Sequence, residues 1–297
     1  MRKLTFLSIY ILVIGLFFGC QENEDTPQIA ATTLPVYEFT STLCEGTGLS
    51  VARVVTEDVS CLHDYTLQVS QMRMIESAQV VVLSGAGLED FLEFSSSLHT
   101  IDASKGIPLL EGACHHHTEH AGHDEDHDAH HHEHDAHIWL SPVNAKRMAE
   151  NICAGLSAQF PENADCFQEN LKNLTAQLNA LESYGNRSLS QLKGRELITF
   201  HDGFAYLADC FQLNILEAVE EESGSEASAA ELISLIELVN EHQLSAIFTE
   251  RSGSTSAASV IAAETGTTIY TLDMAMSGSS YFDAMYHNID TLKEALG

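Results

Sequence analysis

The stretch LQVSQMRMIESAQVVVLSGAGLEDFLEFSSSL, residues 67–98, decides the fold class of this chain. Residues 67–78 have the apolar spacing of an amphipathic helix, residues 80–85 form a continuous apolar run, and residues 88–98 again have helical spacing. A short apolar run between two helices is typical of a buried strand in a parallel sheet, because helices cover both faces of such a sheet. The stretch therefore predicts part of an α/β sheet.

The same alternation continues on both sides of this stretch. Towards the N-terminus, residues 28–34 and 50–55 read as strands, and Pro35 opens a helix to about Cys44. Towards the C-terminus, four further strands are expected at 196–200, 212–219, 244–250 and 267–273, with helices at 203–210, 227–242, 255–266 and 280–295.

Two long helices are expected between these α/β halves. Ser141 followed by Pro142 is a typical helix start, and this helix runs to about Phe160. The second helix, about 164–192, carries leucines three and four residues apart. We expect an α/β protein of two lobes, each a mostly parallel sheet flanked by helices. The expected segments are a signal at 1–19, a tether at 20–27, an N-terminal lobe at 28–160, a linking helix at 161–193 and a C-terminal lobe at 194–297.

The N-terminus predicts export. Arg2 and Lys3 precede an almost wholly apolar run from Leu4 to Phe18, which is shorter than the roughly 20 residues of a membrane-spanning helix. The run ends at Gly19-Cys20 and resembles a bacterial lipoprotein signal, with cleavage before Cys20 and acyl chains such as palmitate on its sulfur. An ordinary signal peptide and an uncleaved anchor are the alternatives. In every version the rest of the chain is extracytoplasmic.

The charge balance excludes one class of partner. Lys and Arg number 13 against 43 Asp and Glu, so the formal net charge is −30. Such a surface repels phosphate backbones, which excludes nucleic-acid binding. Acidity of this kind either concentrates cations near the surface or serves solubility alone.

Export affects the expected oxidation state of the cysteines. Six lie beyond Cys20, and an oxidising compartment permits up to three disulfides among them. We expect one or two disulfides, with buried free thiols as the alternative. Cys114, which borders the histidine-rich run, is also a candidate soft metal ligand. The six are Cys44, Cys61, Cys114, Cys153, Cys166 and Cys210.

A histidine-rich acidic run, residues 111–136, has no apolar periodicity and is expected to be a loop. Its histidines are expected either to collect zinc weakly and pass it on, or to form a solvated spacer. They are His115, His116, His117, His120, His123, His127, His130, His131, His132 and His134.

The candidate metal ligands lie elsewhere, at positions that follow predicted strands. His201 follows strand 196–200, Asp273 ends strand 267–273, and His63 lies in the loop after strand 50–55. His137 ends the histidine-rich run in the ordered-looking segment HIWLSP. Ligands in open α/β sheets bind beyond the carboxyl ends of strands, and three imidazoles with one carboxylate suit Zn²⁺. The three other histidines, His99, His242 and His287, are expected to be structural.

Several segments in order resemble one family, the metal-binding solute-binding proteins of bacterial ABC transporters, in particular the zinc members. The likeness covers about residues 28–297. Its segments are LHDYTLQVSQMRMIESAQVVVLSGAGLEDFLE (62–93), HIWLSPVNAKRMAENI (137–152), ITFHDGFAYLA (198–208), TERSGSTSAASVIAAETG (249–266) and YTLD (270–273).

This resemblance implies two lobes joined by a rigid helix, with one ion bound between them and passed to a membrane permease. It implies a monomer without catalytic activity, and the ligands His63, His137, His201 and Asp273. His201 replaces the glutamate of manganese-preferring members, which favours zinc over the alternative of manganese or mixed binding. The chain departs from the family at Leu62 and Met274, where proline is usual.

Two other functions are alternatives to metal transport. An exported zinc hydrolase is disfavoured because no HExxH motif is present and Asp273 would fill the position of a catalytic water. A surface adhesin is a role that some lipoproteins of this family carry. Around the site, carboxylates next to the ligands are expected either to orient them or to face solvent, and three aromatic side chains are expected to wall the cleft as apolar packing. These are Asp64, Asp135 and Asp202, and Trp139, Tyr65 and Phe204.

Overall fold

The computed structural model describes residues 27–59, 62, 65–90, 92, 98–111, 134–219 and 227–297. Within these residues, no helix is long and apolar enough to cross a membrane. Several predictions fall outside the described residues: the signal segment, Cys20, Cys61, His63, Asp64, Cys114 and the nine histidines between 115 and 132.

The N-terminal half contains one parallel sheet in the order β2-β1-β3-β4. Its central strands are buried on both faces, as the continuous apolar sequence of residues 80–83 predicts. The elements are β1 (Ile29–Ala31), α1 (Leu34–Leu43), β2 (Val51–Arg53), α2 (Val69–Ser77), β3 (Val80–Leu83) and β4 (His99–Asp102).

The C-terminal half repeats this arrangement with the order β6-β5-β7-β8, again all parallel. The two sheets therefore share one topology, which confirms the predicted fold of two parallel α/β lobes. The elements are β5 (Glu196–Phe200), α5 (Ala205–Phe211), β6 (Asn214–Ala218), α6 (Ala229–Glu241), β7 (Ala246–Glu250), α7 (Ser256–Thr265), β8 (Thr268–Leu272) and α8 (Tyr281–Leu296).

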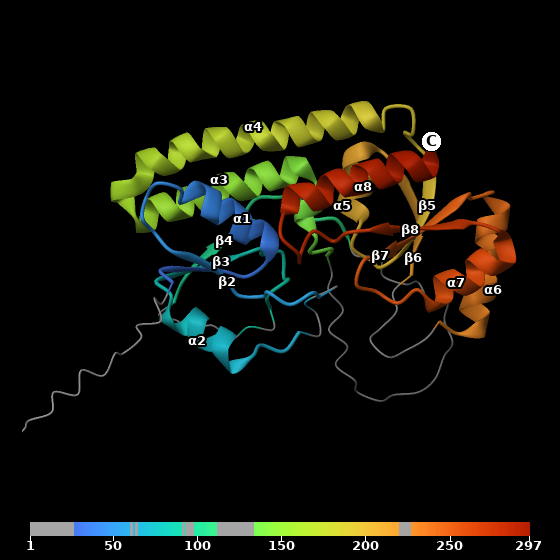
Figure 1. The fold of residues 1–297 in the computed structure, drawn as a ribbon, viewed down its shortest axis with the longest axis horizontal. Helices are drawn as coiled ribbons and strands as arrows, with labels where there is room; N and C mark the ends of the chain where they lie inside the picture. The colour runs from blue at the N-terminus through green and yellow to red at the C-terminus, as the bar shows by residue number, and fades with distance from the viewer. Residues whose placement is uncertain are drawn as a thin grey trace, which may run out of the picture.

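Two long helices connect the halves. These are α3 (Pro142–Gln159), which begins at the cap of Ser141, and α4 (Ala164–Ser188). Short 3₁₀ turns, η1 (Ile138–Leu140) and η2 (Pro161–Asn163), precede them. Figure 1 shows α4 running along one side of the molecule, where it packs on α3, α1 and α8. A single buried stripe of Phe167, Leu174, Leu178, Leu181 and Gly185 holds it there.

One predicted helix is wrong where the structure describes it. Residues 86–90 form turns rather than the start of a helix at 88. The backbone N–H groups of Leu88 and Asp90 donate to the carbonyls of Gly85 and Gly87, three residues back, in turns that begin at residues with positive φ. The Glu89 carboxylate also folds back to accept hydrogen bonds from the backbone N–H groups of Ser84 and Gly85.

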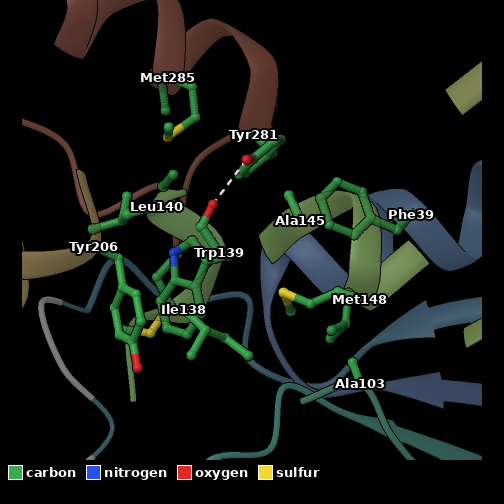
Figure 2. Packing of buried hydrophobic residues seen from close by; sticks show 14 of the residues in the cluster. Phe39, Ala103, Ile138, Trp139, Leu140, Ala145, Met148, Tyr206, Tyr281 and Met285 are labelled. Carbon is green, nitrogen blue, oxygen red and sulfur yellow. Dashed lines mark hydrogen bonds between the residues drawn. The ribbon is translucent and has the colours of Figure 1, made fainter. Parts of the chain in front are cut away.

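The core is continuous across the two halves, and the η1 segment lies inside it. Ile138, Trp139 and Leu140 are fully buried. Figure 2 shows Trp139 among side chains of both halves, with the Tyr281 hydroxyl donating to its carbonyl at 2.8 Å. A second, smaller apolar cluster lies between the C-terminal sheet and the helices α6 and α7. The segment before α3 is therefore fixed by packing from both sides.

The disulfide prediction is wrong for the cysteines that the structure describes. Cys44, Cys153, Cys166 and Cys210 are all free thiols. Burial raises the pKa of Cys44 to about 12, with a smaller contribution from the neighbouring Cys166. Cys44 and Cys153 match the alternative of buried free thiols, whereas Cys166 and Cys210 are half-buried.

Candidate metal site

The topology of the C-terminal sheet gathers chemically active side chains at one edge. His201 directly follows β5, Glu250 ends β7, and Asp273 directly follows β8. Parallel strands place all three at the carboxyl edge of the sheet, and strand order reverses between β5 and β7. This reversal is the switch point at which open α/β sheets bind ligands.

His137 reaches this edge from the segment that precedes α3. Its side chain is buried, with 1% of its surface exposed. Asp135 Oδ1 lies 2.8 Å from both the backbone N and the Nδ1 of His137. Because Asp135 engages Nδ1, Nε2 is the nitrogen that this arrangement assigns to a ligand.

The segment that carries His137 is fixed by the C-terminal half. Tyr206 Oη donates to the Asp135 carbonyl at 3.1 Å, and Trp139 Nε1 donates to the Met274 carbonyl at 2.8 Å. Tyr206 also accepts a hydrogen bond from the backbone N of Leu110, and burial raises its pKa to about 12. Bonds across the two halves thus set the position of His137.

The structure brings His137 and His201 together although they are 64 residues apart in the numbering. Their ring centroids are 5.3 Å apart with an interplanar angle of 80°. Gly203 permits this approach, because a β-carbon there would lie 2.8 Å from the His201 ring and 3.0 Å from His137 Nδ1. Glu250 Oε2 lies 3.8 Å from His201 Nδ1 on the other side.

Asp273 lies at the same sheet edge but is held by other groups. Its Oδ1 accepts from the backbone N of Ala275 at 2.8 Å, and its Oδ2 accepts from Arg251 Nη1 at 3.0 Å. In the part of the chain that the structure describes, no three His, Cys, Asp or Glu side chains form a group ready to hold a metal. Two of the four predicted ligands are therefore adjacent, Asp273 is paired with Arg251, and His63 lies outside the described residues.

Sequence reasoning missed Glu250 and Arg251. Both occur at the end of β7, between His201 and Asp273 along the sheet edge. The strand-end rule that selected His201 and Asp273 applies equally to strand 244–250, so Glu250 was accessible to the same argument. Arg251 was not, because its role depends on where its side chain points.

The remaining predicted residues occupy varied places. His99 is exposed, His242 Nδ1 contacts Glu196 Oε2 at 2.9 Å, and His287 Nε2 lies 3.2 Å from the Thr271 carbonyl. His134 is exposed and forms an isolated antiparallel bridge with Glu111.

Two of the three predicted aromatic side chains take part in apolar packing. Trp139 and Phe204 are buried in the core, and the Trp139 ring lies edge-on to His137 at 5.3 Å. Tyr65 is half-buried and donates to Glu57 at 2.7 Å. Asp202 is half-buried beside His201.

The comparison with known families matches nearly the whole described chain. The model described as "ZnuA: Zinc-uptake complex component A periplasmic" matches residues 29–295. The chain belongs to the ZnuA family. This description names a component of an uptake complex, so the protein is a transport component and not an enzyme.

Relatives of the ZnuA family agree in sequence and in structure. The "High-affinity zinc uptake system protein ZnuA" of Bacillus subtilis is 30% identical over 292 residues, covering 94% of this chain and 90% of that protein. The crystal structure of the metal-dependent lipoprotein YcdH from Bacillus subtilis has a TM-score of 0.74 at 27% identity, covering 91% of this chain and 99% of that one. A ZnuA deletion mutant with zinc bound has a TM-score of 0.75 at 27% identity, covering 91% and 98%.

Proposed function

We propose that this protein captures Zn²⁺ outside the cytoplasm and delivers it to the permease of an ABC importer. The observation that carries the proposal is the pair of histidine rings, 5.3 Å apart, that comes from two segments of the chain and lies at the switch point of a parallel sheet. Two ZnuA relatives support zinc as the cargo, one a high-affinity zinc uptake protein and the other a structure with zinc bound.

In this proposal the zinc ligands are His63, His137, His201 and Asp273. His137 Nε2 is presented by the contact of Nδ1 with Asp135. Neutral imidazoles and a carboxylate give the N/O ligand set that zinc accepts in four-coordinate sites. A site with more oxygen ligands would suit Mn²⁺ better.

The ligand assignment predicts that single histidine substitutions abolish tight zinc binding. Loss of a residue that only supports a ligand lowers metal affinity about 10- to 100-fold. In His137→Ala and His201→Ala, which remove a ligand itself, we expect zinc affinity to fall by more than this. Calorimetric titration of zinc measures this, and His242→Ala is the matched control because that histidine contacts Glu196 away from the site. Unchanged binding in both ligand variants would reject the assignment, and a parallel titration with Mn²⁺ tests the preference for zinc.

The membrane attachment is also a proposal. The Gly19-Cys20 junction after an apolar run supports cleavage before Cys20 and acylation of its sulfur, and one structural relative bears the description lipoprotein. The mass of the mature N-terminal peptide tests this: a diacylated Cys20 supports the proposal, and an unmodified cysteine rejects it.

A further inference from the structure

Arg251 links the ends of two neighbouring strands of the C-terminal sheet. It follows β7, and its backbone N donates to the carbonyl of Leu272, the last residue of β8, at 2.9 Å. Its Nη1 donates to Asp273 Oδ2 at 3.0 Å. The arginine side chain is 66% exposed, whereas that of Asp273 is 9% exposed. A solvent-exposed cation therefore pairs with a shielded carboxylate.

The orientation of Asp273 does not depend on Arg251 alone. Its Oδ1 accepts from the backbone N of Ala275, and its own backbone N donates to Asn288 Oδ1 at 2.7 Å. Asn288 Nδ2 in turn donates to the Asp273 carbonyl at 2.7 Å. These bonds hold the carboxylate in place, so the contribution of Arg251 is chiefly its charge.

The surroundings of Arg251 are otherwise acidic. A small cavity at this edge is lined by Glu250, Arg251 and Asp273, together with Val59, Ser252, Met274 and Ser277. Just outside it, Asp58 of the N-terminal half accepts hydrogen bonds from Ser277 and Ser252, at 2.6 and 3.2 Å. The hydrogen bond from Ser277, and to a lesser extent the charge of Arg251, lower the pKa of Asp58. Among the residues that the structure describes, Arg251 is thus the one cationic side chain in the lining of this cavity.

We propose that Arg251 is a built-in competitor of the metal for Asp273. Its guanidinium neutralises the carboxylate before zinc arrives, and it must move into solvent for Asp273 to serve as a ligand. Because Arg251 is mostly exposed, water replaces the lost pairing at little cost. Arg251 then lowers the affinity for zinc and speeds its release, which is the property that a delivery protein needs. This inference rests on the proposed function.

The test is zinc binding by Arg251→Gln, which keeps most of the side-chain length and removes the charge. We expect zinc to bind about three- to ten-fold more tightly. The gain has two sources: the exposed ion pair with Asp273 no longer has to break, and the arginine no longer repels the metal cation. We also expect slower release into excess chelator, measured by stopped flow. In an Asp273→Asn background, the same substitution should change zinc affinity and release by less, because only the repulsion between the arginine and the metal then remains.

Arg147→Gln is the matched control, because Arg147 is also an exposed arginine paired with a carboxylate, that of Glu150 at 3.1 Å. It changes the net charge equally and should leave zinc affinity unchanged. Tight zinc binding by the parent protein with no gain in Arg251→Gln would overturn the inference alone. Weaker binding in that variant would also overturn it, since it would make Arg251 a positioning residue. Absence of tight binding in the parent protein would reject the proposed function and the inference with it.

Discussion

His137 depends on Asp135 for its orientation. One carboxylate oxygen lies 2.8 Å from both the backbone N and the ring Nδ1 of His137, and both side chains are 1% exposed. A charged acceptor at Nδ1 fixes the tautomer and makes the other nitrogen a better ligand. In the proposed site, Asp135 acts on the metal through His137 rather than by contact.

Asp135→Asn tests this role at the scale of one residue. The amide has nearly the same size but lacks the charge, so we expect zinc affinity to fall about ten-fold while the fold is retained. Competition with a chromophoric chelator measures the affinity, and a thermal melt checks the fold. Asp209→Asn, at an exposed position in α5, is the control. If Asp135→Asn binds zinc as tightly as the parent protein, Asp135 has no positioning role.

The positions of His201 and Asp273 could be predicted from sequence because backbone topology alone decides them. His201 and Asp273 follow strands, and the parallel sheet places both at one edge. The pairing of Asp273 with Arg251 could not be predicted, because it depends on side-chain conformation. Strand order was also needed to show that Glu250 lies between them.

Helix α4 approaches the C-terminal half closely at a glycine, Gly185. A β-carbon at Gly185 would overlap the ring of Phe211 and would lie 3.2 Å from Ile289 Cδ1. Phe211 belongs to α5 and is 2% exposed, so its ring has little freedom to move. The close approach of the connecting helix therefore requires glycine at this position.

Gly185→Ala should destabilise the protein although alanine favours a helix by about 1 kcal/mol over glycine. Overpacking a filled core costs about 1–3 kcal/mol, so we expect a net loss in the free energy of unfolding. Urea denaturation measures it. Gln177→Ala, on the exposed face of α4, should change stability by less than about 0.5 kcal/mol. A Gly185→Ala protein more stable than the parent would show that α4 has room to shift.

At the scale of elements, strongly periodic segments were predictable and weakly apolar ones were not. The buried strands and the leucine stripe of α4 follow from the sequence pattern. Strand β4 was missed because its sequence HTID contains only one buried residue, Ile101, at the edge of the sheet. The turn at residues 86–90, where the predicted helix should begin, depends on a backbone with positive φ at residues 85–87, which helical spacing does not reveal.

The whole molecule repeats one topology around a shared core. Both sheets have the same strand order, and the η1 segment between them carries His137 into contact with His201. This arrangement suits an ion bound between the halves. At the borders of the histidine-rich run, Glu111 and His134 lie side by side as bridge partners.

The most direct test of this account is a calorimetric zinc titration of a protein that lacks residues 115–132. Because Glu111 and His134 are paired, the few residues left between them can close the chain with little disturbance. The account predicts that one tight zinc site survives the deletion, and that only weaker binding is lost relative to the full chain. Disappearance of all tight binding would contradict it and would assign the main site to the histidine-rich run.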